Sequence, residues 1–152
     1  INRWKIEVTN ILTKQTIDKI VYSKMAVHES TWFKEHHILI NYEDIKDGDQ
    51  TIDGKNYFYE YLSSVGVSPE DGARPLERTI DEVLTDEIFE QLYFLGRKPE
   101  DYFIVDVSLS GHAPGTFAYG DSGRKTVQDR RQTHISVKRI PSEEYGNYLL
   151  TS

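Results

Sequence analysis

The sequence contains no cysteine and a single methionine among its 152 residues. The absence of cysteine excludes disulfide bonds, cysteine-ligated zinc, iron–sulfur clusters and a thiolate nucleophile, and it is typical of a reducing compartment. The sequence also lacks an apolar run of the roughly 18 residues that a membrane span requires. No apolar block of the signal-peptide kind appears in the first residues. We therefore expect a soluble, cytoplasmic protein with no membrane partner.

The length and composition predict a single domain over residues 1–152. Hydrophobic residues make up 38% of the chain and aromatic residues 12%, which is enough to build one modest core. The chain begins at Ile1 rather than Met, which is compatible with excision from a longer chain.

Charge is distributed unevenly along the chain, although the formal net charge of −7 hides this. Residues 43–101 hold 16 acidic and 6 basic side chains, whereas the segments on either side are close to neutral. The basic cluster lies between residues 122 and 139, where Asp129 is the single acidic residue. An acidic surface disfavours non-specific nucleic-acid binding, whereas an acidic and a basic segment attract each other within one molecule or between copies.

Alternating apolar and polar residues predict several β-strands. Residues 4–8 alternate, and the β-branched stretch over residues 16–23 is predicted to pair with them as a hairpin. Further strands are predicted over residues 37–42, 103–109 and 134–140. The dipeptide Asp53-Gly54 is predicted to form the two-residue turn of another hairpin, with the tyrosines that follow it on one face of a strand.

The clearest helix is predicted over residues 80–95. Its apolar residues recur at spacings of three and four, Thr79 and Glu82 form a capping box, and Gly96 is a stop signal. One face is then apolar and the opposite face carries the acidic residues. A short helix is also predicted from Ser142. These elements predict an α+β fold with a largely antiparallel sheet of about five strands and one main amphipathic helix, about 80–95, on one face.

Two His-x-Ser triplets, His28-Glu29-Ser30 and His134-Ile135-Ser136, are the candidate catalytic pattern. They are similar to the paired His-x-Thr/Ser motifs of the 2H phosphoesterase family. The resemblance implies that one of His28 and His134 acts as general base and the other as general acid on a cyclic or 2′,3′ phosphodiester, with Ser30 and Ser136 holding phosphate oxygens. A small phosphodiesterase is therefore one alternative function.

Two other short motifs are interpreted as turns and not as sites. Gly-Asp-Ser-Gly around Ser122 matches the surroundings of a serine-protease nucleophile over four residues alone, and its glycines suit a loop. Residues 49–60 have the spacing of a calcium-binding EF-hand loop, but Thr51 replaces the usual Asp, Asn or Ser at its third position, and Asn56 stands where an apolar residue is usual. We therefore predict no metal and no cofactor.

Surface residues carry the functional interpretation that remains. The stretch over residues 110–133 is longer than an ordinary connection and mixes glycine, aromatic and basic residues, which is typical of functional loops. The predicted residues of a partner- or anion-binding site are Tyr119, Arg124, Lys125, Arg130, Arg131, Lys138 and Arg139. Tyrosine is also favoured at interfaces, so some of Tyr57, Tyr59, Tyr61, Tyr93 and Tyr119 are expected in an exposed contact patch.

The sequence therefore predicts a non-enzymatic protein–protein interaction module of inhibitor, adaptor or assembly type. Its expected partner is another protein or a second copy of itself, in which case it forms a homodimer. A binder of phosphate or nucleic acid through residues 124–139 is a further alternative, because this segment holds the basic cluster.

Overall fold

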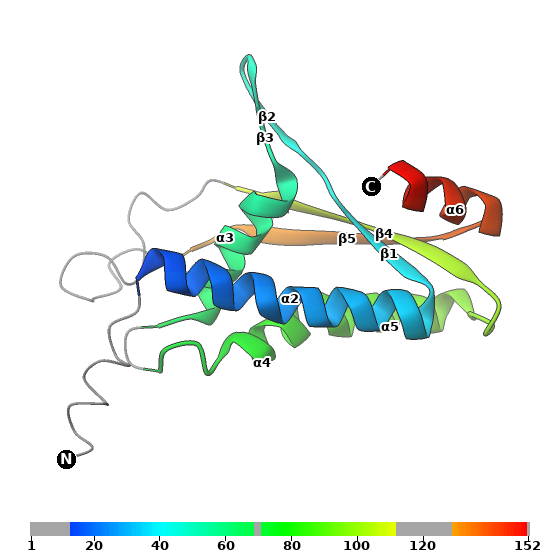
Figure 1. Ribbon diagram of the computed structural model, residues 1–152, viewed down its shortest axis with the longest axis horizontal. Coiled ribbons are helices and arrows are strands. Elements are labelled where there is room, and N and C mark those ends of the chain that lie inside the picture. Colours follow the sequence, from blue (N-terminus) through cyan, green and yellow to red (C-terminus); the bar gives the residue numbers. More distant parts are fainter. Residues whose placement is uncertain (1–12, 69–70, 112–128, 152) are drawn as a thin grey trace.

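The computed structural model describes residues 13–68, 71–111 and 129–151, and Figure 1 shows their arrangement. Helices and strands are mixed along this part of the chain, which confirms the predicted α+β class. None of the helices in the described ranges has both the length and the apolar character needed to cross a membrane.

The main sheet has three strands, β1 (Ile38–Tyr42), β4 (Tyr102–Ser110) and β5 (Gln132–Ile140), in the order β1-β4-β5. The central strand β4 is parallel to β1 and antiparallel to β5. The parallel pair exists because the chain between β1 and β4 crosses over through helices. The sheet is therefore smaller and only partly antiparallel, which corrects the prediction of about five largely antiparallel strands.

Two short strands form a separate hairpin outside the main sheet. They are β2 (Ile45–Asp47) and β3 (Gln50–Ile52), which pair antiparallel and project from the body of the molecule (Figure 1). Gly48 in the turn between them has a φ of +63°, a conformation that glycine adopts without strain. The hairpin turn thus lies at Gly48, and the turn predicted at Asp53-Gly54 is wrong.

The longest helix, α2 (Lys14–His36), occupies the place of the second strand of the hairpin predicted from residues 4–8 and 16–23. Thr13 caps it, because its side chain accepts a hydrogen bond from the Thr16 N–H at 3.1 Å. Its buried residues recur at helical spacing and are Ile17, Val21, Met25 and Trp32. Burial of this face outweighs the small preference of β-branched residues for strands. Residues 4–8 lie outside the described residues.

Helix α3 (Gly54–Gly66) begins at the predicted turn. Asp53 is its N-cap and accepts a hydrogen bond from the Asn56 N–H at 3.3 Å. A Cβ atom on Gly54 would lie 2.2 Å from the backbone oxygen of Glu43, so glycine is required here for close packing. The tyrosines that follow are helical, which corrects their assignment to a strand.

The helix predicted over residues 80–95 is confirmed, with an earlier start. It consists of α4 (Leu76–Ile80), a π-helical turn η1 (Asp81–Thr85) and α5 (Asp86–Leu95). The start follows Pro75, so the capping box predicted at Thr79 is wrong. The predicted stop is correct, because Gly96 adopts the left-handed conformation with a φ of +65°.

The helices lie on both faces of the sheet. Helices α2, α3, α4 and α5 cover one face and form the main core with it, whereas α6 (Ser142–Thr151), which confirms the helix predicted from Ser142, lies against the other face (Figure 1). A smaller cluster under α6 contains Ile104, Ile140 and Tyr145. The prediction of one main helix on one face is thus incomplete, since the described residues contain three further helices, α2, α3 and α6.

Candidate functional site on the outer face of α5

Helix α5 is fixed to the sheet by its inner face. Ile88 and Leu92 are buried in the main core. Between them, the Gln91 side chain bonds to the backbone of β5: Nε2 donates to the Ile135 carbonyl at 2.8 Å, and Oε1 accepts from the Val137 N–H at 3.0 Å. Because both the NH2 group and the carbonyl oxygen of the Gln91 side chain bond to β5, the helix has a defined rotation relative to the edge of the sheet.

The outer face of α5 carries two neighbouring aromatic side chains that are exposed to solvent. Tyr93 is 81% exposed and Phe94 is 76% exposed, and their ring centroids lie 5.8 Å apart in an edge-to-face arrangement. Single exposed apolar residues are common, but two adjacent large aromatic side chains leave a patch that marks interaction sites. We define the outer face of α5 by these two residues together with the exposed acids Asp86, Glu87 and Glu90.

The acidic residues of this face line up with the aromatic pair. Asp86, Glu90 and Tyr93 follow the spacing of four and three residues that places side chains on one side of a helix. Glu87, Glu90 and Phe94 do the same with spacings of three and four. The face therefore changes, from the N-terminus to the C-terminus of α5, from negatively charged to aromatic.

A pocket of about 420 Å³ lies beside the aromatic pair and is lined by Phe89, Leu92, Tyr93, Gly96 and Arg97. The Arg97 guanidinium lies 5.5 Å from the centre of the Phe89 ring and donates to Nδ1 of His36 at 3.1 Å. Burial and the positive charge of Arg97 lower the pKa of His36, which favours the neutral ring that accepts this bond. The rim of the pocket thus carries one fixed positive charge.

Nothing in this arrangement resembles a metal centre. In the part of the chain that the structure describes, no three histidine, aspartate or glutamate side chains form a cluster able to hold a metal ion. The segment with EF-hand spacing, residues 49–60, is divided between β3 and α3. Ser122 lies outside the described residues.

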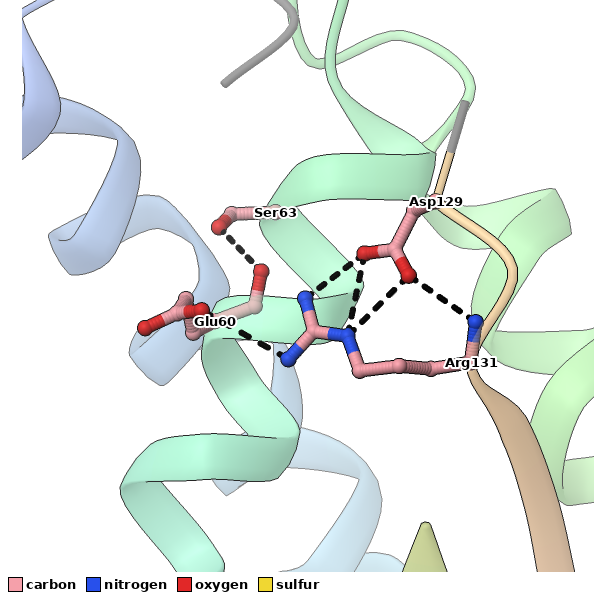
Figure 2. Close-up of polar contacts among 4 residues, drawn as sticks. All are labelled: Glu60, Ser63, Asp129 and Arg131. Atoms are coloured by element: carbon pink, nitrogen blue, oxygen red, sulfur yellow. Dashed lines mark hydrogen bonds and ion pairs between the residues drawn. The ribbon is translucent and has the colours of Figure 1, made fainter. Parts of the chain in front are cut away.

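Arg131, one of the predicted anion-binding residues, is buried instead in an ion pair (Figure 2). Its side chain is 0% exposed and that of Asp129 is 1% exposed. The guanidinium donates to the Asp129 carboxylate, with Nη2 2.6 Å and Nε 3.0 Å from the oxygens, and Nη1 lies 3.5 Å from Glu60 on α3. The rings of Tyr57 and Tyr61 lie 4.9 Å and 5.3 Å from the guanidinium carbon.

The surroundings of this pair hold both groups in their charged forms. Burial raises the pKa of Asp129, but the hydrogen bonds from Arg131 outweigh burial, so the pKa is lowered overall. Burial lowers the pKa of Arg131, but Asp129 outweighs it, so that pKa is raised overall. Arg131 therefore anchors the start of β5 on α3, and its predicted part in binding a partner or an anion stays a prediction.

The other basic residues of the predicted site are dispersed. Arg139 pairs with Asp101 at 3.2 Å and donates to the Leu95 carbonyl at the end of α5, and Lys138 lies 3.6 Å from Asp106. Arg130 is exposed. Tyr119, Arg124 and Lys125 lie outside the described residues, so their part in binding stays a prediction.

The two His-x-Ser triplets lie on opposite sides of the sheet. His28 and Ser30 belong to α2, and His28 contacts Glu77 of α4 at 2.9 Å in the layer of helices. His134 and Ser136 lie on the face of β5 that alternates with the core residues Ile135 and Val137, and His134 bonds to Ser110 at 2.8 Å. The structure does not bring the two histidines to one site.

Of the described tyrosines predicted for an exposed patch, one is exposed. Tyr93 is exposed, whereas Tyr59 and Tyr61 are buried and Tyr57 is half-buried. Phe94 is not among the predicted residues, and the sequence signal for it is its position next to Tyr93 on the acidic face of the predicted helix.

Comparison with known families places the chain in one family. The model of the C-terminal, D2-small domain of ClpB protein matches residues 12–103, which is more than half of the chain. The chain therefore belongs to the ClpB D2-small domain family. The matched part runs from α2 to the beginning of β4 and includes the outer face of α5, whereas β5 and α6 lie beyond it.

None of the curated proteins matches the sequence. Membership of this family points to a chaperone-associated protein-interaction domain.

Proposed function

We propose that this domain is a non-enzymatic protein–protein interaction module of the adaptor or assembly type, and that it contacts its partner through the outer face of α5. The observation that carries the proposal is the pair Tyr93 and Phe94, which are 81% and 76% exposed on a helix whose inner face is fixed to the sheet. Aromatic residues presented on a rigid element are typical centres of protein interfaces.

Family membership supports the same proposal. A domain related to the C-terminal D2-small domain of ClpB protein suits a chaperone-associated role in which it contacts another protein. A second copy of the chain and a cytoplasmic location stay predictions. The phosphodiesterase alternative has no supporting geometry, because His28 and His134 lie on opposite sides of the sheet.

The proposal is tested by replacing the aromatic pair. A tagged wild-type domain and a Tyr93→Ser/Phe94→Ser variant are used to capture proteins from an extract of the source cells, after nuclease treatment, and the captured proteins are quantified by mass spectrometry. We expect a stoichiometric protein that the wild type retains and the variant loses, because truncation of an aromatic centre costs about 2 kcal/mol or more.

Leu150→Ser is the matched control, because Leu150 is 86% exposed on α6, far along the chain from α5. The control should capture the same protein as the wild type. Circular dichroism should show that all three proteins melt alike, since the replaced side chains are exposed. Equal capture by the wild type and the Tyr93→Ser/Phe94→Ser variant would contradict the proposal.

A further inference from the structure

The charge on the outer face of α5 has a single sign over its first two turns, and we infer from it that the partner presents a positively charged, amphipathic segment. This inference rests on the proposed function. Asp86, Glu87 and Glu90 are exposed, and no ion pair among the described residues neutralises them. Complementary charge steers association and selects among partners, so a segment rich in lysine or arginine fits this face.

The aromatic end of the same face supplies the apolar part of the contact. The pocket of about 420 Å³ between Phe89, Leu92 and Tyr93 accommodates an apolar side chain of the partner, and Phe94 offers a second apolar surface next to it. A helix that lies along α5 presents two apolar side chains three or four residues apart on one side. The partner segment therefore combines such an apolar pair with basic residues.

The two ends of α5 also give the bound segment a direction. The acidic residues Asp86, Glu87 and Glu90 precede the aromatic pair, and two basic residues, Arg97 and Lys98, follow it. The basic part of the segment therefore lies along residues 86–90, and its other end, near Arg97, is neutral or acidic. Two copies of this chain that met through this face with their α5 helices parallel would bring their own acidic residues together, and like charges disfavour that contact.

The test uses a displayed library of helical peptides with random residues at exposed positions, selected against the full chain. We expect the selected peptides to carry a net positive charge beside an apolar pair. Their binding should weaken by about 30-fold in the Tyr93→Ser/Phe94→Ser variant, a change that corresponds to about 2 kcal/mol. The charge-reversed variant Asp86→Lys/Glu90→Lys should lose these peptides and select acidic ones, and raising the salt concentration should weaken binding to the wild type.

Four results would overturn the inference. Two concern the selected peptides: they carry no positive bias, or the selection is unchanged in Asp86→Lys/Glu90→Lys. The third is no enrichment over the Tyr93→Ser/Phe94→Ser variant, and the fourth is sedimentation of the wild type as a dimer that Tyr93→Ser/Phe94→Ser dissociates. If capture from the extract still depends on Tyr93 and Phe94, the proposed function stands and the charge of the partner is what was wrong. If that dependence is absent too, both proposals fail.

Discussion

Replacing Arg131 with alanine removes the cation from a buried ion pair and leaves the Asp129 carboxylate buried without a positive charge beside it. The two side chains are 0% and 1% exposed, and the guanidinium makes a 2.6 Å bond to the carboxylate. Removing one partner of a buried pair destabilises a protein by about 3–5 kcal/mol, because the remaining charge stays buried and unpaired. We expect Arg131→Ala to lower the free energy of unfolding by this amount and the melting temperature by about 6–20 °C.

Urea denaturation followed by circular dichroism measures this loss. Arg130→Ala is the matched control, since the neighbouring side chain is exposed and its truncation should change stability by no more than about 0.5 kcal/mol. The double variant Asp129→Ala/Arg131→Ala should lose less than the sum of the two single variants, because it leaves no unpaired charge. A loss for Arg131→Ala as small as that for Arg130→Ala would refute the reasoning.

The same pair predicts a dependence on pH. The hydrogen bonds from Arg131 lower the pKa of Asp129 in the folded protein despite its burial. A lowered pKa stabilises the fold above the ordinary aspartate pKa of about 3.9, and this contribution disappears as the pH falls through the folded-state value. In Arg131→Ala the buried Asp129 carboxyl lacks these hydrogen bonds and is protonated at a higher pH than in the wild type. The difference in unfolding free energy between the wild type and Arg131→Ala should therefore shrink as the pH falls from the pKa of Asp129 in the variant to the lower pKa of Asp129 in the wild type.

Three further substitutions test other parts of the structure. Gln91→Ala should cost about 1 kcal/mol, because it removes both bonds to β5, and light scattering should show more self-association through the uncovered strand edge. Gly54→Ala should destabilise by about 1–3 kcal/mol in thermal melts, since its Cβ would meet a backbone oxygen, whereas Gly146→Ala, with open space around it, should not. Arg130→Glu should leave capture of the partner unchanged; a loss would instead favour the basic segment as the contact.

Elements with regular alternation or a long amphipathic repeat could be predicted from the sequence. Strands β4 and β5 alternate clearly because each has one face in the main core, and the helix ending before Gly96 has a complete apolar stripe. Tyr93 could be predicted to be exposed for the same reason. These features depend on neighbours within a few residues along the chain, which is the information that a single sequence carries.

The features that could not be predicted depend on contacts between distant residues. Helix α2 contains many β-branched residues, and its helical form depends on the burial of one face against α3 and β1. The dipeptide Asp53-Gly54 indicates a turn in the sequence, where the close approach of Gly54 to Glu43 is invisible. Asp129 is the one acidic residue of the basic cluster, but its burial with Arg131 depends on α3, more than sixty residues away.

The pairing of Ser110 with Gln132 has a consequence for engineering the domain. The two ends of the intervening segment are held together by β4 and β5, and the Arg131 ion pair anchors the second end on α3. An insertion between Ser110 and Gln132 therefore has to keep residues 129–131 intact, because the ion pair of Asp129 with Arg131 fixes the start of β5 to α3.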